Sequence, residues 1–229
     1  MAWLRQQYKN VKYSIFDGYG AKSYSQEGED ILLRRIFERN AQGFYIDVGA
    51  HHPKRFSNTY FFYKKGWRGI NIDPSPETIR LFKRYRPKDI NLEIGVSDKS
   101  GKMAYFVFDE PALNSFDERL SLERAENTRY QIVAKRSVNV DRLDSILDKY
   151  LPQGMIIDFM SIDAEGHDEH VVRSNDWTRY RPRCLLVEVV GEDLAGVMDS
   201  PLHQFLVAFD YKLFAKTLNT IFYLDCKKT

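Results

Sequence analysis

Acidic residues and a single glycine turn mark the ends of four apolar segments of this chain. The segments end in Asp47-Val48-Gly49-Ala50, in Asp73, in Asp163-Ala164-Glu165-Gly166 and in Glu188. In an open α/β sheet, ligands bind beyond the carboxyl ends of the parallel strands. We therefore expect these side chains to gather at one edge of a sheet and to hold a ligand there.

The glycine turn and Asp73 indicate which kind of ligand this would be. Gly49 lets the backbone approach a bound molecule closely, and Asp47 could hold the ammonium group of a cofactor. Asp73 could accept hydrogen bonds from both hydroxyls of a ribose, the alternative being a turn-forming aspartate before Pro74. The chain has neither a G-x-G-x-x-G fingerprint nor a G-x-x-x-x-G-K-[ST] phosphate loop. These patterns favour a nucleoside cofactor without a pyrophosphate.

A second group of polar residues, near the ends of two later apolar segments, could move a proton. Asp163, Glu165, His167 and Glu188 are candidates for the general base that a weakly nucleophilic hydroxyl needs. Asp163 and Glu188, with His167, also form a donor set that suits Mg²⁺ or Mn²⁺. The alternative is that residues 165–168 only cap the following helix. The sequence leaves these interpretations open.

Strand-like and helix-like segments alternate along the chain. The patterns predict strands at 43–50, 68–73, 90–96, 103–108, 137–140, 155–163, 184–190, 211–216 and 220–225. They predict helices from an N-cap at Ser25 and at 56–64, 75–86, 143–150, 168–175 and 201–209. We expect a mostly parallel sheet with helices on both faces, and a C-terminal hairpin that adds an antiparallel strand at one edge.

Length and composition fit one α/β domain. The 229 residues, 43% of them apolar, predict a domain at 23–229 after an N-terminal extension at 1–22. The polar stretch 109–135 has no clear period and is predicted to be a lid or an acceptor-binding insertion. A net charge of +2 gives no general reason to expect a nucleic-acid or membrane partner. Without a signal peptide or membrane helix, we expect a cytoplasmic protein, and two cysteines predict no disulfide framework.

Several segments together resemble the FkbM-type methyltransferase family. They are Tyr24 to Asp30, Tyr45 to Ala50, Ser57 to Tyr60, Gly66 to Pro74 and Asp158 to His167. The resemblance implies a Rossmann-like class I methyltransferase fold. It implies S-adenosylmethionine as the methyl donor and O-methylation, frequently of sugars, glycans or natural products.

The resemblance also implies a set of cofactor contacts. Gln26 and Glu29 would lie beside the cofactor, Asp47 to Ala50 would hold its methionine part, and Asn58 would support that loop. Asp73, followed by Pro74, would bind the ribose, Val96 and Ser97 would flank the adenine, and Asp163 would also border the cofactor.

Two other function classes remain as alternatives. A nucleic-acid methyltransferase is disfavoured because the chain lacks an N-P-P-[YF] motif and an overall basic character. A non-catalytic cofactor-binding scaffold is disfavoured because buried carboxylates are costly to retain without a use. We expect a small-molecule or glycan acceptor, and the sequence leaves a homo-oligomer open.

Overall fold

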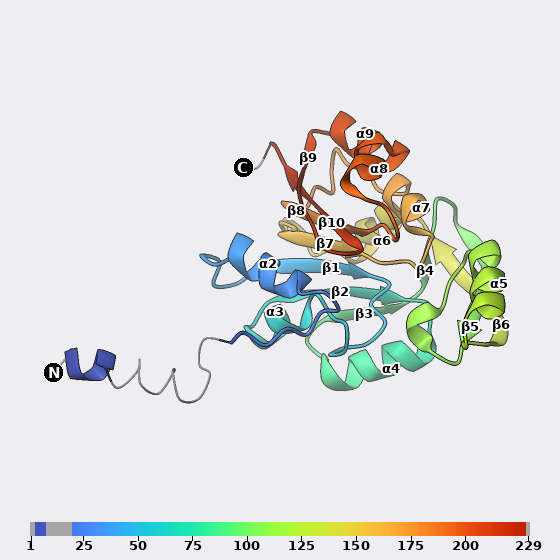
Figure 1. Ribbon diagram of the computed structural model, residues 1–229, viewed down its shortest axis with the longest axis horizontal. Helices are drawn as coiled ribbons and strands as arrows, with labels where there is room; N and C mark the ends of the chain where they lie inside the picture. Colours follow the sequence, from blue (N-terminus) through green and yellow to red (C-terminus); the bar gives the residue numbers. More distant parts are fainter. Residues whose placement is uncertain (1–2, 8–19, 228–229) are drawn as a thin grey trace.

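The computed structural model describes residues 3–7 and 20–227 (Figure 1). Of the predicted N-terminal extension, residues 1–2 and 8–19 lie outside these ranges. The helices of the domain are α2 (Glu29–Ile36), α3 (Tyr60–Lys64), α4 (Pro76–Tyr85), α5 (Glu118–Asn127), α6 (Leu143–Tyr150), α7 (Asp168–Arg173), α8 (Leu194–Asp199) and α9 (Pro201–Ala208), with a 3₁₀ turn η1 at Pro111–Leu113. None of the helices in the described ranges is both long and apolar enough to cross a membrane.

Seven strands form the central sheet, in the order β3-β2-β1-β7-β8-β10-β9. They are β1 (Phe44–Val48), β2 (Arg68–Asp73), β3 (Ile90–Glu93), β7 (Phe159–Ile162), β8 (Cys184–Glu188), β9 (Tyr211–Lys216) and β10 (Thr220–Asp225). The first five of these pair in parallel, whereas β10 pairs antiparallel with both β8 and β9. The mostly parallel sheet is confirmed. The C-terminal hairpin is confirmed at one edge of the sheet, where the reversed strand β10 pairs with β8 and β9 is the outermost strand.

The central strands are buried on both faces, so their alternate residues enter two separate cores. In β1, Phe44, Ile46 and Val48 join the larger core, to which α6, α7, α8 and α9 contribute. Tyr45 joins the smaller core with Leu33 of α2 and Phe62 of α3. Because successive side chains of a strand point to opposite faces of the sheet, β1 packs against the helices on both faces. Because helices cover both faces, the ends of the strands are where the sheet can meet a ligand.

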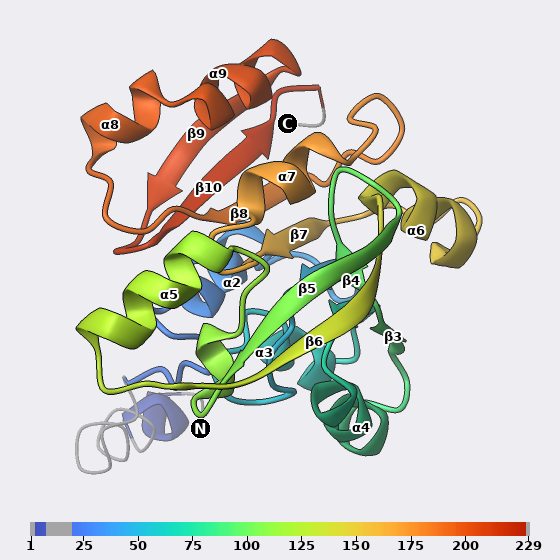
Figure 2. The same ribbon diagram turned by 90° about the vertical axis from the view of Figure 1, so that its right-hand side faces the viewer.

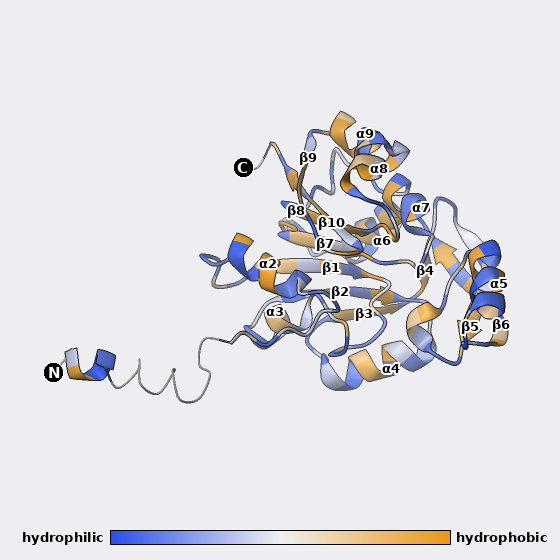
Figure 3. Cartoon of the chain, viewed as in Figure 1, coloured by the Kyte–Doolittle hydropathy of each residue, from blue (hydrophilic) through white to orange (hydrophobic). Residues whose placement is uncertain are grey.

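A second, three-stranded sheet lies beside the first, in the order β4-β6-β5 (Figure 2). Its strands are β4 (Gly95–Val96), β5 (Gly101–Phe108) and β6 (Ile132–Asp141), so the strand predicted at 90–96 is divided between two sheets. The strand expected at 137–140 begins earlier, because β6 pairs with β5 along most of its length. The stretch 109–135, predicted as a lid or acceptor-binding insertion without a clear period, contains η1, α5 and the start of β6. Figure 3 shows α5 as largely hydrophilic, which is why its sequence gave no apolar period.

The start of α2 differs from the prediction and contacts the C-terminal hairpin. The helix begins after Gly28, whose φ of 90° is left-handed, and Ser25 instead accepts a hydrogen bond from the backbone N–H of Asp30. The carboxylate of Glu27 accepts hydrogen bonds from the backbone and side-chain nitrogens of Asn219 at 2.8 and 2.7 Å. The segment before α2 is thereby joined to the turn between β9 and β10.

A buried polar network lies under β1 and β2, on the face covered by α3 and α4. The Arg86 guanidinium, fully buried, donates to Asp89 at 2.9 Å, to Thr59 at 2.9 Å and to the Tyr45 hydroxyl at 2.7 Å. Thr59 in turn donates to Asp47 at 2.6 Å. A buried carboxylate is tolerated only when it is paired and hydrogen-bonded, so this network holds the end of β1 in place.

We expect that replacing Arg86 with methionine destabilises the fold by about 3–5 kcal/mol, because Asp89 and Asp47 would then be buried without a counterion. The free energy of unfolding, measured by urea denaturation, tests this. The control is Arg35→Met, since Arg35 forms an exposed ion pair with Glu38 and such pairs contribute less than about 1 kcal/mol. Equal effects of the two substitutions would show that the network does not support the fold.

Candidate functional site

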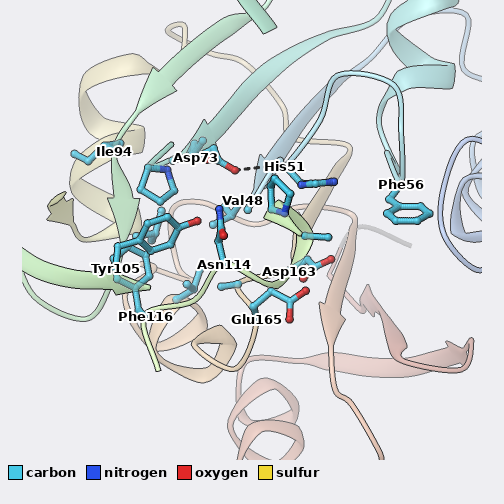
Figure 4. A pocket seen from close by; sticks show the side chains of 18 of the residues that line it. Val48, His51, Phe56, Asp73, Ile94, Tyr105, Asn114, Phe116, Asp163 and Glu165 are labelled. Atoms are coloured by element: carbon cyan, nitrogen blue, oxygen red, sulfur yellow. Dashed lines mark hydrogen bonds between the residues drawn. The ribbon is translucent and has the colours of Figure 1, made fainter. Parts of the chain in front are cut away.

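A cleft opens at the carboxyl ends of β1, β2 and β7 (Figure 4). Its empty volume is about 700 Å³, including space open to solvent, which is in the range of cofactor sites. The residues predicted for the site that line it are Gln26, Gly49, Asp73, Pro74, Val96, Asp163 and Glu165. The structure therefore brings together the glycine turn and the acidic strand ends.

Position 49 requires glycine for two reasons, its left-handed backbone conformation and the close approach of a neighbouring backbone segment. Its φ is 75°, and a Cβ built on it would lie 1.6 Å from the carbonyl oxygen of Asp163. The N–H groups of Gly49 and Ala50 donate to the carbonyl of Ile72 at 3.0 and 3.2 Å. The sequence suggested that this glycine admits a ligand. In the structure it admits the backbone of β7, and in this way brings the ends of β1, β2 and β7 together.

Asp73 joins two loops at the end of β2. Its two carboxylate oxygens accept hydrogen bonds from the backbone N–H groups of His51 at 3.0 Å and Ser75 at 2.8 Å. Each oxygen keeps a further lone pair, and the residue lines the cleft. Burial raises the pKa of Asp73 to about 7, although both backbone hydrogen bonds act to lower it. A ligand that donated to this carboxylate would stabilise its charged form.

Three residues of the cleft wall have backbone conformations that side chains rarely adopt. His51, Phe56 and Glu165 have φ values of 49°, 53° and 52°. Such strain gathers at ligand sites because the surrounding structure must enforce it. His51 also carries a buried Nε2 without a hydrogen-bond partner, and burial followed by the charge of Arg55 lowers its pKa to about 4. The imidazole is therefore neutral and offers an unused polar atom beside the cleft.

Carboxylates of Asp163, Glu165 and Glu188 lie so close that one oxygen of each falls within 4.8 Å of the others. Solvent in the open cleft reaches Asp163, yet protein surrounds the group, and this desolvation together with the charge of Glu188 raises its pKa well above the usual value. Burial and the neighbouring Glu165 raise the pKa of Glu188 to about 8. Like charges this close favour a shared proton.

The segment between β5 and β6 forms one wall of the cleft. Pro111, Ala112, Asn114 and Phe116 line it. Arg124 of α5 holds Glu165 in an ion pair at 2.5 Å. The stretch predicted as a lid therefore contacts both the cleft and its acidic cluster.

One end of the cleft is apolar and aromatic. Figure 4 shows Tyr105 and Phe116 together, on the opposite side of the view from Phe56. Ile94 and Val96 line the same pocket, and the Tyr105 and Phe116 rings lie 4.8 Å apart. Sequence reasoning did not select these aromatic residues. The one available signal was a phenylalanine following Asn114 and Ser115 in an otherwise polar stretch.

Several residues expected beside the cofactor do not line this cleft. The side chain of Asp47 faces the buried Arg86 network, where desolvation raises its pKa, so it is not positioned to hold an ammonium group in the cleft. Asn58 donates to Ser161 of β7 at 3.0 Å, and Glu29 accepts from Thr217 at 3.0 Å. These residues support the strands and the hairpin around the cleft.

His167 and Ser97 contact each other beside the cleft. The Ser97 hydroxyl lies 3.0 Å from Nε2 of His167, and the His167 ring stacks on His170 at 4.4 Å. Burial lowers the pKa of His167 to about 4. Among the described residues, the cluster of donor atoms that could hold a metal ion consists of Asp163, Glu165 and Glu188 and does not include His167. The expected role of His167 as base or metal ligand is therefore not carried into our proposal. The turn interpretation fits Asp168, which accepts from the N–H groups of Ala164 and Gly166.

Comparison with known proteins identifies the family. The family model described as the methyltransferase FkbM domain matches residues 47–213. The chain belongs to the FkbM methyltransferase family. A search of curated proteins found no significant match.

Two solved structures match this chain in a structural comparison. One is the methyltransferase FkbM from Methylobacillus flagellatus KT, with a TM-score of 0.53 and 13% identity over 88% of this chain and 48% of that protein. The chain thus spans about half the length of that relative. The other is a TehB-like SAM-dependent methyltransferase from Corynebacterium glutamicum, with a TM-score of 0.46 and 11% identity over 97% of this chain and 98% of that one. The Rossmann-like methyltransferase fold expected of this FkbM family member is confirmed.

We expect Gly49→Ala to lower stability by several kcal/mol, because it adds both backbone strain and a collision with the Asp163 carbonyl. Gly154→Ala is a matched control, since Gly154 has a φ of 73° and open space around it. That control should cost only about 1–2 kcal/mol from the left-handed backbone. Thermal unfolding of both variants separates the cost of the backbone strain from the cost of the collision. Equal losses of stability in the two variants would refute the close packing of Gly49.

Proposed function

We propose that this chain is an S-adenosylmethionine-dependent methyltransferase that transfers a methyl group to a hydroxyl. The observation that carries the proposal is the meeting of Asp73 and the Gly49 turn in one cleft, with an aromatic end on one side and carboxylates on the other. The arrangement has the dimensions and polarity that an adenosyl cofactor requires.

The residues of the cleft fit the parts of the cofactor. Asp73 would accept hydrogen bonds from the ribose hydroxyls, and Val96 with Phe116 would contact the adenine. Gln26 and the unpaired Nε2 of His51 would lie along the methionine part. When bound, the cofactor supplies an electrophilic methyl group on sulfur. The chain's own task is then to align the acceptor hydroxyl and to exclude water.

The pair Asp163 and Glu188 would receive the proton of the acceptor hydroxyl. A general base works best when its pKa is near the working pH, and the pKa of Glu188, raised to about 8, meets that condition. Burial and the charge of Glu188 also raise the pKa of Asp163 well above its usual value. Arg124 neutralises Glu165, so the neighbouring pair keeps the proton-accepting role. The pair titrates as a unit, and the rate should rise with pH as its shared proton is lost.

We propose a sugar, glycan or natural-product hydroxyl as the acceptor, and a cytoplasmic location. A nucleic-acid acceptor is disfavoured by the near balance of 34 basic and 32 acidic residues. A non-catalytic scaffold is disfavoured by the strained backbone and the clustered carboxylates of the cleft.

A divalent ion is the alternative use of the carboxylate cluster. Oxygen atoms of Asp163, Glu165 and Glu188 are the donor type that Mg²⁺ and Mn²⁺ prefer. Binding of such an ion would require the pair to lose its shared proton. We place the proton-sharing pair first because Arg124 already balances one of the three charges.

The affinity for S-adenosylhomocysteine should depend on pH through Asp73. A ribose donates to the ionised carboxylate, so affinity should be constant above about pH 7 and fall by up to tenfold per pH unit below it. Isothermal titration of the wild type and of Asp73→Asn measures this. The variant should bind more weakly and lose this pH dependence, whereas an unchanged profile would remove Asp73 from the site.

Asp163→Asn and Glu188→Gln should each lower turnover by about 10²–10⁴-fold, while cofactor affinity changes far less, because the pair acts on the acceptor proton. Labelled methyl transfer to an acceptor found by screening gives the rate. Glu169→Gln is the control, since Glu169 is an exposed carboxylate of α7 paired with Arg173. Full rates in both cleft variants would reject the assignment.

Treatment with a chelator should leave turnover unchanged, because the shared-proton pair needs no ion. The rate is measured before and after removal of divalent ions, and again after Mg²⁺ or Mn²⁺ is added back. A loss of activity that either ion restores would instead assign the carboxylates to a metal site.

A further inference from the structure

Beyond the cleft, an exposed basic surface continues from its mouth. We call it the basic surface and define it by Lys22, Arg34, Lys54, Arg55, Lys64 and Lys65. These residues line two shallow hollows with Tyr24, Tyr60 and Phe61 among their other wall residues. Neither hollow has an aspartate or glutamate in its lining, although the whole chain is nearly neutral.

The basic surface is continuous with the proposed active site. Phe56 lines both the cleft and the first hollow, and Lys22 and Tyr24 line both hollows. Figure 4 places Phe56 on the side of the cleft away from Tyr105 and from Phe116, the residue that we assigned to the adenine together with Val96. A long acceptor whose hydroxyl reached Asp163 could therefore extend over this surface.

Within the described residues, the four lysines of the surface are not balanced by carboxylates, although Lys64 donates a hydrogen bond to the Tyr24 hydroxyl at 2.9 Å. Arg34 and Arg55 form ion pairs with Asp30 and Glu110. Lys22, Lys54, Lys64 and Lys65 are exposed and form no ion pair with any carboxylate in the described residues. Unbalanced charges gathered beside a cleft attract and orient ligands of the opposite sign.

Cations lie near two aromatic rings of the surface, Tyr24 and Phe61. Lys22 and Lys64 each lie 5.3 Å from the centre of the Tyr24 ring, and Arg34 and Lys65 lie 3.7 and 5.7 Å from that of Phe61. A single-stranded nucleic acid binds by stacking its bases on open aromatic faces. Arg34 already lies against the Phe61 ring, and the lysines beside Tyr24 add positive charge around the other ring, so the surface offers mainly positive groups.

We propose that the acceptor is an acidic glycan, whose carboxylate groups bind the basic surface while one hydroxyl enters the cleft. The proposal rests on the proposed methyl transfer for its second half, but binding of the glycan can be tested by itself. An acidic glycan carries widely spaced carboxylates and no nucleobases, whereas a nucleic acid carries closely spaced phosphates. The separated lysines of the basic surface match the charge spacing of the glycan better.

The test is a binding titration of the full chain with oligogalacturonate and with a neutral dextran oligosaccharide of matched length. Oligogalacturonate should bind, salt should weaken the binding, and dextran should not compete. Lys22→Glu combined with Lys65→Glu should weaken binding by about tenfold or more. Lys83→Glu combined with Lys88→Glu, the same charge change on an exposed part of the chain near α4, should stay within about twofold of the wild type.

Three outcomes would overturn the proposal. They are no binding of oligogalacturonate, equal loss in the two double variants, or binding of single-stranded RNA or anionic vesicles that is tighter than that of the glycan and is lost in the Lys22/Lys65 variant. A parallel titration with S-adenosylhomocysteine separates the two hypotheses. If the wild type binds the glycan but not this nucleoside, the proposed methyl transfer fails while the glycan surface stands.

Discussion

The carboxylate of Asp73 is the interaction on which the candidate site depends. It ends β2, accepts N–H groups from the loop after β1 and from the start of α4, and still faces the cleft. The loop after β1 can reach it because Gly49 packs directly on the Asp163 carbonyl of β7. Three strand ends are thus joined by backbone contacts, and the carboxylate that joins them is also the group best placed to recognise a ribose.

Buried carboxylates occur in two different environments in this protein. On one side of β1, Asp47 is stabilised by Thr59 and by the Arg86 network, and this arrangement supports the strand. At the ends of β7 and β8, burial and the neighbouring carboxylates raise the pKa values of Asp163 and Glu188. The same residue type is structural where a guanidinium balances it, and we propose that it is reactive where another carboxylate faces it.

The sequence was sufficient to predict the features that depend on local residue patterns. Apolar runs located the strands, and Gly49, Asp73 and Asp163 were assigned to one ligand-binding edge because strand ends converge. It could not predict that β10 enters between β8 and β9, since that depends on pairing between distant segments. Nor could it predict that Asp47 faces Thr59, that His167 contacts Ser97, or that Tyr105 and Phe116 close the cleft. Those contacts depend on how side chains from different elements meet in the folded chain, which a local pattern does not show. The hydrophilic α5 that carries Arg124 has no apolar period from which a helix could be predicted.

The most direct test of the account is a crystal structure of the chain with S-adenosylhomocysteine. The account predicts both ribose hydroxyls within hydrogen-bond distance of the Asp73 carboxylate, the adenine against Val96 and Phe116, and the sulfur toward Asp163. A nucleoside bound elsewhere, or one whose ribose makes no contact with Asp73, would contradict it.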